Sequence, residues 1–307
     1  MAEPAATGPA LVLVVGDVMT DIIVRPEGPL VVGSDRRAAI RSRPGGSGAN
    51  QAVWLAAFGL EVRFAARVGA ADRDSFAARF ERLGVEAVFT ADRELPSGTL
   101  VTILDPDGER SFLTDRGANA ALCEADLSGE LLDEVALLVV SGYCFFEPGP
   151  RKAVMGLIAA ARARRIAVAV DPASVGFLEE IGPANFLAWT AGANSIFANQ
   201  SEAMTLTGAA GLDAQVRALG RHYGRVIVKC GAAGAVLGGR AGIALRLPAP
   251  VVEVIDSTGA GDAFAAGFIA ADLAGEGEEQ SLMRGIAAGT DAVRRLGGQP
   301  PAPRLPS

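Results

Sequence analysis

Residues 255–268 read IDSTGAGDAFAAGF and contain the clearest structural signal in this 307-residue chain. The preceding apolar run, PVVEVI at 250–255, predicts the end of a strand, and an Ala- and Phe-rich helix follows. The small residues at 259–261 place backbone N–H groups at the first helical turn, where they have no intrahelical partner and the helix dipole favours an anion. Asp262 supplies a carboxylate that can accept a proton beside that anion. The pattern predicts phosphoryl transfer to an alcohol, and the simpler interpretation is a glycine-containing turn with an acidic cap.

Length and composition indicate one large α/β domain with a small appendage, because 307 residues is long for an ordinary single domain. Half of the residues are hydrophobic, which excludes a disordered chain. The net charge of −7 and the mixed order of charges argue against a nucleic-acid binder or a protein of anionic membranes. A phosphate site must therefore be built from local donors.

The cysteines indicate a reducing compartment. Cys123, Cys144 and Cys230 stand far apart without CxxC spacing, which favours free thiols in a cytoplasmic protein. The first residues have no basic segment before their short apolar run, and we expect neither a signal peptide nor a membrane span.

Two rare residue types limit the chemistry. His222 is the only histidine, which argues against multi-histidine metal sites and against Ser-His or Cys-His catalysis. Lys152 and Lys229 are the only lysines, and neither completes the GxxxxGK[ST] motif of Walker-type NTPases.

The first strand, at 11–16, predicts a ligand-binding edge, because Asp17 and Asp21 follow its carboxyl end. Asp21 either binds substrate hydroxyls or is a solvated loop carboxylate. Residues 44–59, PGGSGANQAVWLAAFG, come later and predict a glycine turn and a helix.

In that segment Gly45 and Gly46 allow close backbone approach, Ser47 is a candidate helix cap, and Asn50 falls in the first turn. Gln51 occupies the last position of a GxGxxG pattern, and a dinucleotide-binding interpretation therefore lacks its main support.

Two β-rich insertions predict a lid sheet. Residues 21–43 alternate loosely around Gly and Pro turns without a helix, and residues 97–119 read as a hairpin around the turn at 105–108. We therefore expect a lid formed by 21–43 and 97–116. The remaining segments, 1–20, 44–96 and 117–307, form the main domain. Arg116, at the exit of the hairpin, either faces substrate or forms a structural salt bridge.

From residue 135 onward, strands and helices alternate regularly, which predicts a mostly parallel sheet with helices on both faces. Strand-like runs occur at 135–141, 166–170, 194–198 and 225–230; helical stretches occur at 150–165, 200–207, 212–221, 259–274 and 281–296. Asn199 and Glu202 follow a strand and suit either a hydrated magnesium ion or a capping box. Gly231 and Gly234 leave room for a nucleotide against the backbone, although a plain hairpin turn explains them equally well.

Three motifs together resemble the ribokinase-like sugar kinases, also called the phosphofructokinase-B family: DSTGAGDAF at 256–264, PGGSGAN at 44–50 and NQSE at 199–202. Their order and spacing match the family from about residue 11 to 299. The resemblance implies a three-layer α/β/α Rossmann-like domain with a β lid. It also implies ATP-dependent phosphorylation of a sugar hydroxymethyl group and dimerisation through the lid in many members.

The resemblance assigns roles residue by residue. It implies Asp262 as catalytic base and Gly259, Ala260 and Gly261 as the anion hole. Sugar-binding positions are Asp21, Gly45, Gly46 and Asn50, and ATP-binding positions are Asn199, Glu202, Lys229, Gly231 and Gly234. Glu202 holds magnesium through water, and Asp256 and Thr258 match the potassium site of members that use this ion.

Three alternatives stay open. A nucleoside kinase of the same family needs aromatic residues around the base, for which Phe112, Phe145 and Phe146 are candidates, although core packing is their commoner role. A catalytically silent sugar sensor is the second alternative, and the intact Asp262 and Glu202 argue against it. A dehydrogenase is the third, and it lacks the glycine fingerprint. The sequence does not identify the acceptor.

Overall fold

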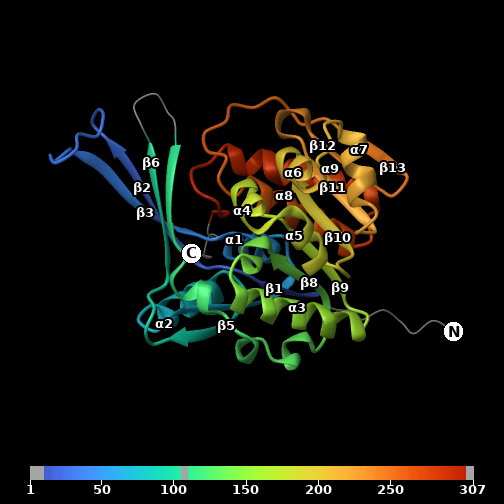
Figure 1. Ribbon diagram of the computed structural model, residues 1–307, viewed down its shortest axis with the longest axis horizontal. Helices are drawn as coiled ribbons and strands as arrows, with labels where there is room; N and C mark the ends of the chain where they lie inside the picture. The colour runs from blue at the N-terminus through green and yellow to red at the C-terminus, as the bar shows by residue number, and fades with distance from the viewer. Residues whose placement is uncertain (1–9, 105–109, 302–307) are drawn as a thin grey trace, which may run out of the picture.

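The computed structural model describes residues 10–104 and 110–301, in which a large nine-stranded sheet is flanked by helices (Figure 1). The strand order is β13-β12-β11-β10-β9-β8-β1-β4-β5, and only the pairings of β12 are antiparallel. The strands are β1 Leu11–Val15, β4 Glu61–Gly69, β5 Val85–Asp92, β8 Val135–Ser141, β9 Ala167–Asp171, β10 Ser195–Asn199, β11 Arg225–Lys229, β12 Ala235–Gly239 and β13 Gly242–Leu247. The predicted α/β class and mostly parallel sheet are confirmed.

Both faces of this sheet are buried, which explains why a central strand such as β1, LVLVV, is apolar at every position. In β1, Val12 and Val14 point into one core cluster, whereas Leu13 and Val15 point into the other. Successive side chains of a strand point to opposite faces, so an uninterrupted apolar run is stable only between two layers.

The helices divide between the two faces of the sheet. Residues of α1, α2, α8 and α9 belong to the first core cluster, and residues of α3 to α7 belong to the second. Their bounds are α1 Ser47–Ala57, α2 Arg73–Arg82, α3 Pro148–Ala163, α4 Val175–Ile181, α5 Pro183–Trp189, α6 Gln200–Thr207, α7 Leu212–Leu219, α8 Ala260–Leu273 and α9 Glu278–Val293. Short 3-10 helices occur at Gly117–Ala121, Glu124–Asp126, Gly129–Leu132, Gly142–Phe145 and Gly231–Ala233. None of the helices in this part of the chain has the length and hydropathy needed to cross a bilayer.

A second sheet of four strands projects from the body (Figure 1). Its order is β3-β2-β6-β7, formed by β2 Met19–Pro26, β3 Ala38–Gly45, β6 Gly98–Leu104 and β7 Arg110–Asp115. The two predicted insertions therefore join in one small sheet, through a parallel pairing of β2 with β6. The hairpin turn expected at 105–108 lies outside the described residues.

The carboxyl ends of the parallel strands meet at one edge of the large sheet. Asp171, Asn199 and Lys229 are the last residues of β9, β10 and β11, and Asp17 follows β1. Ligands of open α/β sheets bind outside this edge, so the topology gathers the polar side chains of distant segments there.

Two local expectations were wrong, and some elements were not predicted. Residues 250–255 do not form a strand; Val251 and Val254 are exposed, and the segment runs along a cavity instead of pairing. Strands β5 and β13 and helices α4 and α5 were not predicted. Ser47 is not a helix cap: Gly46 holds that position with φ +97°, and Ser47 is the first residue of α1.

Candidate active site

A cavity of about 690 Å³ lies at the carboxyl edge of the large sheet and extends under the second sheet. Asp21 and Arg116 line it at the end near the second sheet, and Asp262, residues 249–252 and Val254 line it as well. Small-molecule sites typically have volumes of about 300–1,000 Å³. The cavity is therefore large enough for two small substrates in contact.

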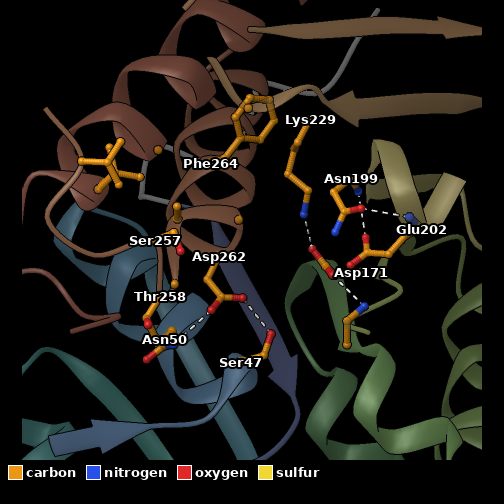
Figure 2. Close-up of a pocket in the computed structure, with 18 of the residues that line it drawn as sticks. Ser47, Asn50, Asp171, Asn199, Glu202, Lys229, Ser257, Thr258, Asp262 and Phe264 are labelled. Atoms are coloured by element: carbon orange, nitrogen blue, oxygen red, sulfur yellow. Dashed lines mark hydrogen bonds and ion pairs between the residues drawn. The ribbon is translucent and has the colours of Figure 1, made fainter. Parts of the chain in front are cut away.

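Asp262 lies at the start of α8 and is buried, with 9% of its surface exposed. Ser47 Oγ donates to its Oδ1 at 2.7 Å, Asn50 Nδ2 donates to Oδ2 at 3.0 Å, and Gln51 Nε2 donates to Oδ1 at 3.2 Å. Figure 2 shows Ser47 and Asn50 pointing toward this carboxylate from α1. The N-terminal turns of α1 and α8 thus hold the proposed base in one orientation.

Burial, together with the negative charge of Asp171, raises the pKa of Asp262 to about 7. Hydrogen bonds from Ser47 and Asn50 oppose this effect, since they stabilise the charged carboxylate. A carboxylate with a pKa near neutrality is matched to accepting a proton at physiological pH.

The first turn of α8 presents donors to the same cavity. Gly259 precedes the helix with φ +71°, and Ala260 N–H donates to Ser257 O at 3.3 Å. Within the described residues, the N–H groups of Gly261 and Asp262 donate to no backbone acceptor. Gly259, Ala260, Gly261 and Asp262 all line the cavity, so these donors face space in which an anion fits.

Gly259→Ala is expected to lower the free energy of unfolding by about 1–3 kcal/mol more than Gly275→Ala does. Both glycines have φ above +70°, so both substitutions introduce similar backbone strain. A Cβ at Gly259 would lie 2.4 Å from Gly298 Cα, whereas a Cβ at Gly275 meets no atom within 4 Å. Urea unfolding of the two variants measures the difference, and equal losses would contradict the close packing of this turn.

Lys229, Asp171 and Glu202 form a charged cluster beside the α8 turn. Lys229 Nζ lies 2.8 Å from Asp171 Oδ2, and the two side chains are 14% and 9% exposed. Burial lowers the pKa of Lys229, but the charges of Asp171 and Glu202 and the Asp171 hydrogen bond outweigh it, so the pKa is raised overall. Burial and repulsion from Asp171 raise the pKa of Glu202 to about 7.

Asn199 and Glu202 form the capping box that the sequence allows. Asn199 N donates to Glu202 Oε2 at 2.8 Å, and Glu202 N donates to Asn199 Oδ1 at 2.9 Å. The capping bond uses Oε2 of Glu202, and Glu202 lines the cavity. The two carboxylates of the cluster exceed the single charge of Lys229, a donor set that fits a hydrated divalent cation with few protein ligands.

Asp21 and the glycine pair are packed together at the end of the cavity near the second sheet. A Cβ at Gly45 would lie 2.2 Å from the Asp21 carboxylate, and a Cβ at Gly46 would lie 2.5 Å from Asp17 O. Only glycine fits at these positions. Asp21 Oδ1 is buried without a hydrogen-bond partner, and burial together with the charges of Asp17 and Asp256 raises the pKa of Asp21 to about 6.

Arg116 lines the same end, with its guanidinium 5.0 Å from the centre of the Tyr143 ring. Its Nε is buried and has no hydrogen-bond partner. Asp115, the neighbouring acid, instead accepts from Gly117 N at 2.9 Å. No ion pair of Arg116 is found in the described ranges, so the expected structural salt bridge is not formed there.

Gly231 and Gly234 line the same cavity as residues 249–252 and Val254. Gly234 has φ +90°, and a Cβ there would lie 1.9 Å from Leu247 O, which requires glycine. The apolar residues that were taken for a strand therefore line the cavity, along with Phe264.

Asp256 and Thr258 lie just before the first turn of α8. Asp256 Oδ1 accepts from Thr258 N at 3.0 Å and from Thr258 Oγ1 at 2.8 Å, while Oδ2 accepts from Gly297 N at 3.0 Å. This buried carboxylate ties the turn to the segment after α9.

The model described as pfkB family carbohydrate kinase matches residues 9–305. The chain belongs to this family. It is a phosphotransferase with an alcohol acceptor. Bifunctional protein HldE of Pseudomonas paraeruginosa is 34% identical over 310 residues; the alignment covers 94% of this chain and 61% of HldE, so the kinase spans about three fifths of that relative.

Solved structures show the same fold. A ribokinase from Arabidopsis thaliana complexed with ribose and ATP has a TM-score of 0.80 and 25% identity, covering 95% of this kinase and 94% of that chain. Adenosine kinase from Sinorhizobium meliloti has a TM-score of 0.85 and 22% identity, covering 96% of both chains.

Sequence reasoning missed several residues of this kinase's cavity. Asp17 accepts from Ser47 N at 3.2 Å, Gly48 N at 3.3 Å and Ser141 Oγ at 3.2 Å, and its position after β1 was the only signal. Gln51 was considered only as a missing glycine, yet it contacts Asp262. Asp171 directly follows the strand-like run at 166–170, and that position was its only signal. The nucleoside-kinase candidates Phe112, Phe145 and Phe146 do not line the cavity, and Phe145 is fully buried in the core.

Proposed function

We propose that this kinase transfers the γ-phosphoryl group of ATP to a hydroxymethyl group of a sugar. The observation that carries the proposal is the Asp262 carboxylate, held in a cavity beside the N–H groups of Gly261 and Asp262 that have no backbone acceptor. A base beside an anion-binding turn is the arrangement that phosphoryl transfer to an alcohol requires.

In this mechanism the acceptor hydroxyl binds between Asp262 and the α8 turn. Asp262 accepts the hydroxyl proton as the new O–P bond forms and the bond from the γ-phosphorus to the bridging oxygen breaks, releasing ADP. Since Ala260 N–H donates to Ser257 O, the N–H groups of Gly261 and Asp262 are the donors that stabilise the negative charge on the transferred group. Lys229 adds positive charge beside Gly261, since a Cβ at Gly261 would lie 3.1 Å from Lys229 Nζ.

Magnesium is proposed at Glu202, through water, with Asp171 as its neighbour. When bound, the ion offsets the repulsion between the phosphates and the incoming nucleophile. Asn199, Gly231 and Gly234 are proposed to bind ATP, whose base would lie against the apolar segment 249–254. The four-stranded sheet, residues 21–43 and 97–116, is proposed as a lid that excludes water.

Asp21, Gly45, Gly46 and Asn50 are proposed to bind the sugar. Asp21 is the strongest candidate, because its Oδ1 is buried at the cavity wall without a partner and can accept from a hydroxyl. Asn50 is bonded to Asp262 through Nδ2, while its Oδ1 has no partner and can accept from the same sugar.

The unpaired guanidinium of Arg116 favours an acceptor substrate with an anionic group, such as a sugar acid or a sugar phosphate. A buried guanidinium N–H without an acceptor is costly, by about 1–3 kcal/mol, and an anion at that point would satisfy it. Arg116→Gln is expected to raise KM for an anionic acceptor by about tenfold or more and to leave KM for neutral sugars unchanged. Equal effects on both classes would contradict this assignment.

A screen of ADP release tests the function. Purified protein is incubated with ATP and magnesium and with pentoses, hexoses, sugar acids, sugar phosphates or nucleosides, with and without potassium. We expect turnover with a sugar-type acceptor. Turnover with nucleosides alone would favour the nucleoside kinase, and ligand-dependent melting without ADP release would favour a silent sensor.

The pH profile of turnover is expected to have an acid limb near pH 7. Asp262 acts only as the carboxylate, and its pKa is raised to about 7, so activity falls as pH drops through that value. Ser47→Ala removes a bond that favours the charged form, and should move the limb to higher pH. Ser75→Ala, an exposed serine on α2, is the control; a limb unchanged in Ser47→Ala would contradict Asp262 as its source.

Two finer features are proposals as well. Potassium is placed at the turn of Asp256 and Thr258, and activation by potassium but not by sodium would support it. A homodimer through the lid is supported by Ile40, Phe112 and Leu113, which are 65%, 58% and 61% exposed on that sheet, and light scattering measures it. The cytoplasm is the proposed location, supported by three free thiols.

A further inference from the structure

A second cavity, of about 610 Å³, lies outside the catalytic cavity and is rich in arginine. Arg43 of β3, Arg79 and Arg82 of α2 and Arg295 after α9 line it. The other lining residues are Pro44, Leu83, Leu296, Gly297, Gly298, Gln299, Pro300 and Pro301. None of these residues is acidic, although the chain as a whole carries a net charge of −7.

The guanidinium groups have few counter-charges. Arg295 pairs with Asp291 at 2.8 Å. No ion pair of Arg43, Arg79 or Arg82 occurs within residues 10–104 and 110–301. Arg79 is half-buried, and burial together with the charge of Arg82 lowers its pKa. Arg79 has lost part of its hydration and lies near the positive charge of Arg82, which is costly unless an anion binds between them.

Gln299 adds a donor to this cavity. Its Oε1 accepts from Arg79 Nη2, and since a guanidinium only donates, the amide must be oriented this way. The other half of the amide, the Nε2 donor of Gln299, is buried without a hydrogen-bond partner. The polar side chains of the cavity thus offer donors alone, which is the chemistry that recognises a phosphate group.

Residues 297–298, which form part of the cavity wall, also contact the residues that hold the α8 turn. Gly297 N donates to Asp256 Oδ2 at 3.0 Å, and Trp54 Nε1 of α1 donates to Gly298 O at 2.9 Å. Gly298 also packs against Gly259. A molecule in the second cavity would therefore touch the segment that holds both α1 and the α8 turn.

We propose that the cavity lined by Arg43, Arg79, Arg82, Arg295 and Gln299 binds a phosphorylated small molecule, with the phosphate between Arg79 and Arg82. This site is separate from the catalytic cavity, and the inference does not rest on the proposed function. The volume of about 610 Å³ accommodates a sugar phosphate as well as inorganic phosphate.

Isothermal titration calorimetry in a buffer free of phosphate and sulfate tests the proposal, with inorganic phosphate, glucose 6-phosphate and glucose as probes. Arg82→Gln is the main variant, because Arg82 is exposed at the end of α2 and its loss does not disturb the core. Arg79→Gln is the second variant. Arg240→Gln, an exposed arginine between β12 and β13, is the matched control. Lys229→Met reports on phosphate at the catalytic turn.

We expect saturable binding of at least one phosphate probe, whereas any binding of glucose, which the catalytic cavity can hold, should not change in the arginine variants. Arg82→Gln and Arg79→Gln should each raise Kd by about tenfold or more, while Arg240→Gln and Lys229→Met leave it unchanged. Tighter binding of glucose 6-phosphate would identify an organic phosphate as the ligand class, and equal binding would identify free phosphate. Binding lost in Lys229→Met but kept in both arginine variants, or no binding of either phosphate probe, would overturn the proposal.

Discussion

Asp262→Asn is expected to lower kcat by about 10²–10⁴-fold, because the amide cannot accept the proton of the acceptor hydroxyl. The side chain keeps its size, and Asn50 and Ser47 remain close enough to hold it. KM for ATP should change little, since the backbone donors of the α8 turn and Lys229 are retained. Steady-state ADP release with the best acceptor measures the effect.

Asp272→Asn is the matched control for this prediction. It makes the same chemical change on the same helix, at a residue whose ion pair with Arg225 is partly exposed. Such pairs contribute little to stability, and we expect activity close to that of the unmodified protein. An Asp262→Asn enzyme that keeps more than about a tenth of its turnover would rule out the assigned base.

Lys229→Met is expected to lower kcat/KM for ATP by about 10²–10³-fold, as the loss of an electrostatic donor at a phosphoryl-transfer site does. Lys229 Nζ lies beside Gly261 at the mouth of the anion-binding turn. The same change leaves Asp171 and Glu202 buried without their cation, and removing one partner of a buried pair typically costs about 3–5 kcal/mol of stability. Partial protonation of Glu202, whose pKa is about 7, should reduce this cost.

The double variant Lys229→Met with Asp171→Asn separates the two effects. Removing both charges should restore most of the lost stability in urea unfolding, but not kcat/KM for ATP, because the cation at the phosphates is still missing. Lys152→Met is the control, since Lys152 is an exposed lysine paired with Glu124. Recovery of both stability and activity in the double variant would show that Lys229 acts only on folding.

Much of the fold could be predicted because its signals are local. The turn before α8 and the capping box of Asn199 and Glu202 depend on residues within a few positions of each other. The alternation of apolar strands and helices likewise predicts a mostly parallel sheet without knowledge of contacts. The edge strands β5 and β13 were missed because few neighbours constrain their pattern. Residues 250–255 were misassigned, since an apolar run does not reveal whether it pairs with a strand or faces a ligand.

The sequence by itself determined that a glycine turn and an acidic residue begin one helix, that a glycine pair begins another, and that polar residues end the parallel strands. Only the tertiary structure decided that Ser47, Asn50 and Gln51 hold Asp262, that Lys229 neutralises Asp171, and that arginines of α2 and β3 share a cavity with the segment after α9. The physical reason is the distance along the chain over which each interaction acts. Steric limits and helix caps involve residues a few positions apart, whereas a contact between residues more than 200 positions apart forms only after the helices pack on the sheet.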